Sequence, residues 1–154
     1  MNRSQSELKE VYAALGECQA DELRLLNGLR HLLDQPTTEQ SRSSLFLIIQ
    51  QLATHLRHHL ELAGKGGYLV EVHRIRPGWH RQIESLHAAN LWCITVLDEL
   101  HERIERELPS AAIEAKVNVE IENWIRTLAA VREDECRLLQ RAFSIAPGAE
   151  AREK

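Results

Sequence analysis

The sequence predicts an all-α protein, specifically an up-down-up-down antiparallel four-helix bundle. Four stretches of the chain carry apolar residues at alternating three- and four-residue spacing, which places those residues along one face of a helix. Glycine and proline are few, with 7 and 4 residues among 154, and 27% of the residues are charged. The links between the four stretches are mostly short, so we expect successive helices to pack antiparallel. An open helical array is the alternative arrangement.

The predicted helices span residues 5–34, 44–64, 77–108 and 111–143, all within a single domain of residues 1–154. Ser43 or Ser44 is the expected N-cap of the second helix, because a hydroxyl there accepts from a free backbone N–H. Pro77 suits the first turn of the third helix. Ser110 is the expected N-cap of the fourth. The segment GGYLVEV (66–72) is less regular and is the one stretch that also suits a strand.

Each apolar stripe is interrupted once by an ionisable or amide side chain. In chain order the four interruptions are Glu22, His59, Asn90 and Glu135. Core positions that face one another across a bundle are where such folds build metal sites. Buried charge is also costly unless it is paired or coordinated. We therefore expect a buried polar cluster, and these four residues are the candidate metal ligands.

Histidine is frequent, with eight residues, and three of them fall in HLRHH (55–59). His55 and His59 are four residues apart, a spacing that lets two imidazoles of one helix reach the same ion. Only His59 lies on the apolar stripe, so we expect His55 and His58 at the surface or its boundary. A second helical face, also expected in solvent, consists of His80, Glu84 and His87. His55, His58 and His87 are the lower-ranked metal ligands.

Composition excludes several classes of function. The net charge of −4 offers no basic face for nucleic acid, and no apolar run approaches the roughly 18 residues that span a membrane. Three cysteines without a close pair indicate a reducing cytoplasm, and Cys18, Cys93 and Cys136 are expected to be buried, inert thiols. Neither a nucleophile elbow nor a phosphate-binding loop is present, so the chain is not expected to be an enzyme.

Three longer runs resemble the hemerythrin-like, HHE cation-binding domains. They are HLELAGKGGYLVEVHRIRP (59–77), LHAANLWCITVLDEL (86–100) and ECRLLQRAF (135–143). The resemblance covers most of the chain. It implies a four-helix bundle in which histidines and carboxylates from all four helices hold a non-haem di-iron centre.

Matched position by position, the resemblance implies only part of that ligand set. His59 and Glu135 are retained, and Glu22 stands where the family has a first-helix histidine. The family's other ligands are replaced by Ala63, Asn90, Val131 and Ala146. The resemblance therefore implies a bundle that has lost the family's di-iron centre.

Three interpretations of the remaining cluster stay open. The first is structural, with no cofactor and a protonated imidazole hydrogen-bonded between carboxylates. In the second, Glu22, His59 and Glu135 bind a single ion, with Asn90 orienting a water; the ion is non-haem iron, otherwise zinc or manganese. The third is an interaction module whose surface binds a protein partner or a second copy in a homodimer.

Overall fold

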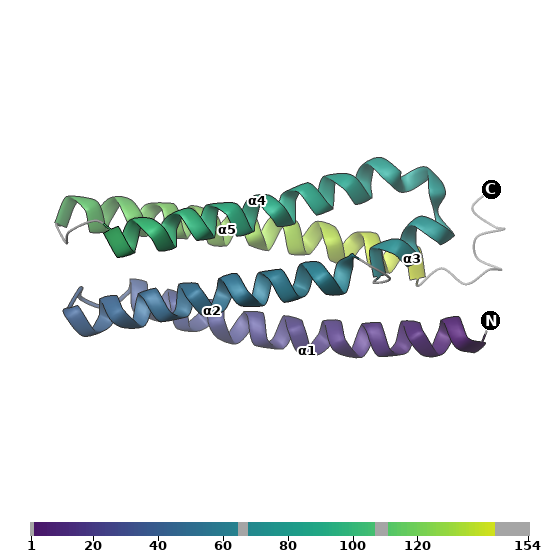
Figure 1. Ribbon diagram of the computed structural model, residues 1–154, viewed down its shortest axis with the longest axis horizontal. Coiled ribbons are helices and arrows are strands. Elements are labelled where there is room, and N and C mark those ends of the chain that lie inside the picture. The colour runs from purple at the N-terminus through teal and green to yellow at the C-terminus, as the bar shows by residue number, and fades with distance from the viewer. Residues whose placement is uncertain (1, 65–67, 107–110, 144–154) are drawn as a thin grey trace.

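Four long helices packed against one another make up most of the chain that the structure describes (Figure 1). The computed structural model describes residues 2–64, 68–106 and 111–143. The long helices are α1 (Asn2–Leu33), α2 (Glu39–Ala63), α4 (His80–Arg106) and α5 (Ala111–Phe143). A short helix, α3 (Tyr68–Ile75), and a 3₁₀ turn, η1 (Pro77–Trp79), connect α2 to α4. Every element of the described chain is helical, so the predicted all-α class is confirmed.

The long helices lie side by side along most of their length. α1 contacts α2, α2 contacts α4, and α4 contacts α5. In Figure 1 the start of α1 and the end of α5 lie at the same end of the molecule. None of the helices in the described ranges is long and apolar enough to cross a membrane.

The second long helix begins earlier than the sequence pattern predicts. Ser41 N donates to Thr38 Oγ1 over 3.0 Å, and Thr38 N donates to Ser41 Oγ over 2.7 Å. This reciprocal pair is a capping box, which satisfies two backbone donors at once and makes Thr38 the N-cap. The prediction of Ser43 or Ser44 is therefore wrong, and the predicted N-cap Ser110 lies outside the described residues.

The stretch that suits a strand is helical from Tyr68 onward, and its first two residues, 66 and 67, lie outside the described residues. Within α3, Tyr68, Leu69 and Val72 are buried, a spacing that follows one face of a helix. Packing of this face against α2 and α5 outweighs the strand preference of its aromatic and β-branched residues. The predicted third helix, 77–108, begins as the 3₁₀ turn η1, and the α-helix α4 starts only at His80.

The predicted apolar stripes form the core. Ile49, Leu97 and Leu128, from three different helices, are completely buried. Close packing extends to the α1–α2 contact, where a Cβ on Gly28 would lie 2.7 Å from Ile48 Cδ1. The remaining members of the core that are less than 2% exposed are Leu29, Leu52, Leu56, Ala63, Tyr68, Val72, Cys93, Leu100, Ile121 and Trp124.

The predicted burial of the cysteines is confirmed at two positions and wrong at one. Cys18 and Cys93 are buried, but Cys136 is exposed. Cys136 follows the stripe residue Glu135, and a step of one residue turns a side chain about a quarter of the way around the helix.

We predict that Leu128→Ala lowers the free energy of unfolding by about 2–5 kcal/mol, because it leaves a cavity at a completely buried position. Val119→Ala is the matched control, since Val119 lies on the same helix and is 56% exposed. Its effect should stay within about 0.5 kcal/mol. Chemical denaturation monitored by helical circular dichroism measures both changes, and equal losses would contradict the described core.

Candidate functional site

The four polar interruptions meet in the core. Glu22 is 5% exposed, His59 1%, Asn90 3% and Glu135 1%, and no other charged or amide residue among those whose burial is described is buried. His59 Nε2 donates to Glu135 Oε1 over 2.7 Å. Asn90 Nδ2 donates to the Leu86 carbonyl oxygen over 2.9 Å and lies 3.4 Å from Glu135 Oε2. The predicted buried cluster thus draws one residue from each long helix.

A fifth residue, Arg132 of α5, occupies the middle of this cluster. Its Nε and Nη2 donate to the two oxygens of Glu22, with each closest contact at 2.9 Å. Its Nη1 donates to Asn90 Oδ1 over 2.7 Å and lies 3.4 Å from Glu135 Oε2. The two-point contact with Glu22 is the strong, planar arrangement that arginine makes with a carboxylate. The group between the carboxylates is therefore a guanidinium, whereas the structural interpretation of the sequence expected an imidazole.

The sequence carried a signal for Arg132 that the stripe pattern did not use. Arg132 lies just beside the stripe residue Val131, but it is three residues before Glu135 and so shares a helical face with that carboxylate. Two buried carboxylates also require positive charge nearby. A long basic side chain at the edge of a stripe meets that need, because its stem covers apolar surface while its head reaches inward.

Three more side chains extend the cluster, two on the α1–α2 side and one on the α3 side. Cys18 Sγ lies 3.5 Å from His59 Nδ1 and 3.6 Å from His55 Nε2. His55 Nε2 is also 3.5 Å from Glu22 Oε1. On the α3 side, the Tyr68 hydroxyl lies 3.4 Å from His59 Nε2. The expectation of a boundary position for His55 is met, yet the residue participates in the cluster.

Both carboxylates of the cluster are held ionised. Burial opposes ionisation of Glu22, but hydrogen bonds from His55 and Arg132 outweigh it and hold the pKa of Glu22 at about 2. The same balance lowers the pKa of Glu135, where the hydrogen bond from His59 makes the largest favourable contribution. Arg132 keeps its charge, because its contact with Glu22 raises its pKa in spite of burial.

The two histidines of the cluster favour their charged forms. Hydrogen bonds with Cys18 and then Glu22 raise the pKa of His55 to about 9. Burial opposes the charge on His59, but contacts with Cys18 and Glu135 outweigh it and raise the pKa. Tyr68 stays protonated, since burial and the neighbouring Glu135 raise the pKa of its phenol.

These residues do not fit the metal centre that the resemblance implies. A guanidinium with three of its nitrogens bonded to Glu22 and Asn90 lies where a cation would need those same oxygens. Ala63 and Val131 supply no donor atoms at two further family positions. Within the ranges that the structure describes, no three His, Cys, Asp or Glu side chains are arranged to hold a metal ion.

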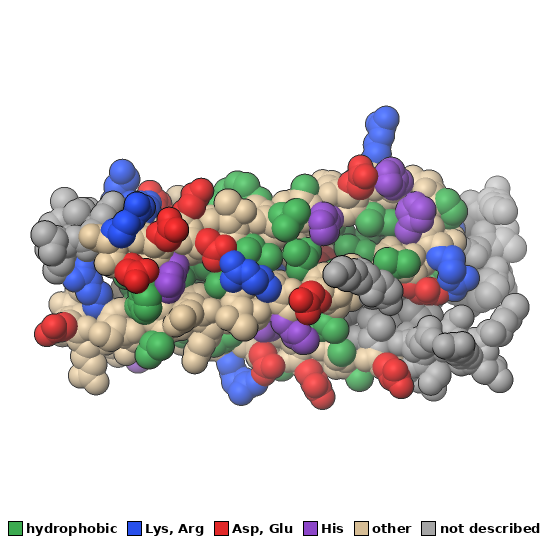
Figure 2. All heavy atoms as spheres, in the orientation of Figure 1, with side chains coloured by type: hydrophobic (Ala, Val, Ile, Leu, Met, Phe, Trp, Pro, Cys, Tyr) green, Lys and Arg blue, Asp and Glu red, His purple; other side chains and the backbone are tan. Residues whose placement is uncertain are grey.

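The lower-ranked histidines outside the cluster lie in solvent. His58 and His87 are both exposed. His80 pairs with Glu84 over 3.1 Å on the face that was expected to be solvated. His73, His80 and His87 line a groove between α3 and α4, and Figure 2 shows several histidines gathered over that half of the molecule.

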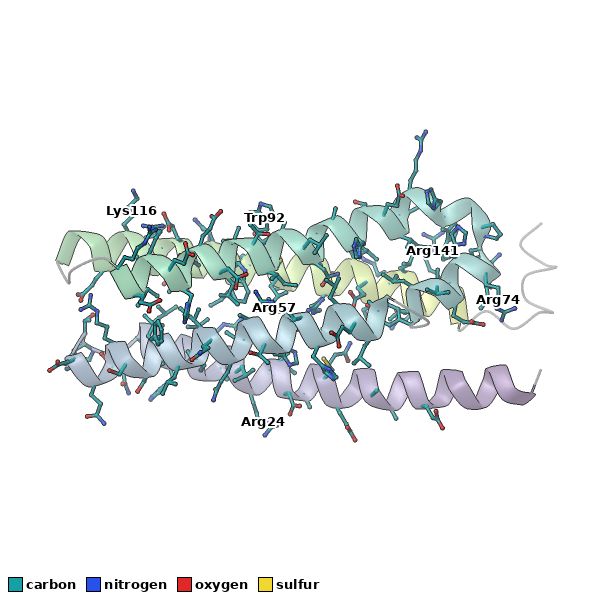
Figure 3. All side chains as sticks on the ribbon, in the orientation of Figure 1. Arg24, Arg57, Arg74, Trp92, Lys116 and Arg141 are labelled. Carbon is teal, nitrogen blue, oxygen red and sulfur yellow. The ribbon has the colours of Figure 1, made fainter. Side chains whose placement is uncertain are left out.

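On the face seen in Figure 2, acidic and basic side chains are interspersed. Arg57 extends from α2 toward α4 in Figure 3, where it pairs with Asp98 over 2.5 Å. Trp92 projects from α4 with half of its surface exposed (Figure 3). Arg141 lies over the ring of Trp79, 5.2 Å from its centroid.

Comparisons with known proteins found no counterpart. No protein-family model matches the chain, and neither does any curated protein or solved structure.

We predict that Arg132→Met lowers the free energy of unfolding by about 3–5 kcal/mol, because it leaves two buried carboxylates without their shared cation. In Glu22→Gln/Arg132→Met the loss should be less than the sum of the two single losses, by about 0.5–3 kcal/mol. Arg137→Met is the matched control. Arg137 pairs with Asp134 three residues away on the same helix, but both are exposed, so its loss should stay below about 1 kcal/mol. Additive single losses at Glu22 and Arg132, measured by urea denaturation, would contradict the coupled pair.

Acid should weaken the fold through Glu22. The pKa of Glu22 is lowered from 4.5 to about 2, so its ionised form stabilises the folded state above pH 4.5 and this stabilisation is lost as the pH falls toward 2. The shift corresponds to about 3 kcal/mol, from about 1.4 kcal/mol for each pH unit. We expect Glu22→Gln to flatten the fall in unfolding free energy between these pH values. An unchanged acid profile in the variant would contradict the assignment.

Proposed function

We propose that this protein is a hemerythrin-like, up-down-up-down bundle that works without a metal, as a structural, sensory or interaction module. The observation that carries this proposal is the position of Arg132 between Glu22, Asn90 and Glu135. The family's metal ions supply positive charge among carboxylates in the bundle core. Here a guanidinium supplies positive charge among the carboxylates, and it needs no metal supply.

The contacts of Asn90 also support a core without a metal. An amide at position 90 is a poor metal ligand, but its oxygen accepts a 2.7 Å hydrogen bond from Arg132 while its nitrogen donates to Leu86. Both the oxygen and the nitrogen of the amide are therefore hydrogen-bonded. Buried polar groups satisfied in this way constrain helix register, because a slip by one turn would leave charges unpaired.

The mononuclear alternative is less well supported. A cation bound by Glu22, His59 and Glu135 would have to displace Arg132 from its contacts with both carboxylates. The displaced guanidinium would then lie beside the ion and repel it. The metal-independent bundle requires no such rearrangement.

The surface offers places for a protein partner. Leu91 and Trp92 on α4 are 43% and 50% exposed, and Val119 on α5 is 56% exposed. Trp92 borders a groove between α4 and α5 whose floor includes Leu100 and Trp124. Exposed aromatic residues of this kind are frequent at interfaces. This supports an interaction role, with a protein partner or a second copy as the occupant.

The proposal predicts that metals neither accompany nor stabilise the protein. After expression in medium supplemented with iron, zinc and manganese, elemental analysis should give far less than one ion per chain. The melting temperature should be unchanged when each metal is added, whereas a ligand at a hundred times its Kd would add about 2.7 kcal/mol of stability. Near-stoichiometric metal that is lost in His59→Ala and retained in the exposed control His58→Ala would overturn the proposal.

A further inference from the structure

The cluster contains a nucleophilic side chain, Cys18, that takes no part in the contacts between Arg132 and the two carboxylates. Cys18 lies on α1 one turn before Glu22, is 4% exposed, and faces two imidazole nitrogens. His59 contacts Cys18 through Nδ1 and Glu135 through Nε2, so the three residues form a thiol–imidazole–carboxylate series. In this order the carboxylate orients the imidazole and the imidazole activates the sulfur, which is the arrangement of a nucleophilic thiol.

The charges around Cys18 favour its thiolate. Glu22 and Glu135 are two anions, whereas Arg132 and the protonated forms of His55 and His59 are three cations. Ionisation of Cys18 supplies the missing anion. Burial raises the pKa of this thiol, but hydrogen bonds from His55 and His59 outweigh burial and lower it to about 7.

Cys93 provides the contrast within the same protein. It is also buried, but no histidine is among the groups that shift its ionisation, and burial raises its pKa to about 11. At neutral pH its thiol is therefore almost entirely protonated. Burial without a neighbouring imidazole therefore leaves a thiol of this core protonated, and the two imidazoles beside Cys18 make the difference.

We propose that Cys18 is a redox-modification site, a thiolate that hydroperoxides oxidise to a sulfenic acid. The inference goes beyond the metal-independent bundle and does not rest on the resemblance, because it depends only on the contacts of Cys18, His55 and His59. The small exposed fraction of Cys18 selects a small oxidant such as hydrogen peroxide over a bulky disulfide. His55 lies at the boundary of the core, with 9% of its side chain exposed, and its Nε2 is 3.6 Å from the sulfur.

The reaction balances within the cluster. The sulfur of Cys18 attacks one peroxide oxygen, so that an S–O bond forms while the O–O bond breaks. The other oxygen leaves as hydroxide and takes the proton of an imidazolium, His55 or His59, to become water. Sulfur loses two electrons and the peroxide gains them. One thiolate and one imidazolium are consumed together, so the buried charges remain balanced afterwards.

The test treats the full chain with hydrogen peroxide at pH 7, alkylates the remaining thiols after denaturation, and quantifies each cysteine by mass spectrometry. We expect Cys18 to gain one oxygen at least about tenfold faster than Cys93, because a thiolate is the reacting form. A thiol reductant should reverse this gain, as it does for a sulfenic acid. Oxidation of Cys18 no faster than that of Cys93 would overturn the proposal, and this comparison needs no variant.

A matched pair of variants tests the activation. In His55→Gln the rate at Cys18 should fall severalfold, because one of the two imidazoles that stabilise the thiolate is gone. His58→Gln, on the same helix but exposed, should leave the rate unchanged. Circular dichroism checks that both variants are folded. An unchanged rate in folded His55→Gln would overturn the role of the histidines.

Discussion

The neutralisation of two buried carboxylates is the constraint on which the rest of the structure depends. Glu22 on α1 and Glu135 on α5 are both nearly inaccessible, and Arg132 contacts the two of them at once. A buried ion pair of this kind contributes little net stability compared with a well-packed apolar core, but loss of one partner is costly. The cluster therefore acts mainly on specificity. It admits one register of α1 against α5, since any other register leaves a charge unpaired.

Asn90 and His59 complete the arrangement because both polar atoms of each side chain have a partner. The amide of Asn90 accepts from Arg132 and donates to the backbone of its own helix. The imidazole of His59 contacts Glu135 through one nitrogen and Cys18 through the other. Every long helix is thus tied into one hydrogen-bonded network. A network that uses all its polar atoms in this way restrains the helices more strongly than separate pairs do.

The same network links structure to chemistry. The charges that hold α1 in place also surround the sulfur of Cys18, so a group that a purely apolar core would leave inert becomes ionisable near neutral pH. The two proposals, a metal-independent bundle and a reactive thiol, therefore rest on one electrostatic environment. They can be tested separately, because metal independence depends on Arg132 and the reactivity of the thiol depends on the histidines beside Cys18.

The sequence by itself determined the helices and the four polar positions of the core. Apolar spacing was sufficient for this, because Glu22, His59, Asn90 and Glu135 lie on stripes whose other members are buried or half-buried wherever their burial is described. Only the tertiary structure decided what stands between them. Arg132 lies beside a stripe, so the apolar pattern does not include it in the predicted cluster, and the β-branched residues of α3 also suit a strand. The reach of a long side chain across the bundle, and the packing that makes a short segment helical, depend on neighbours that are distant in the chain.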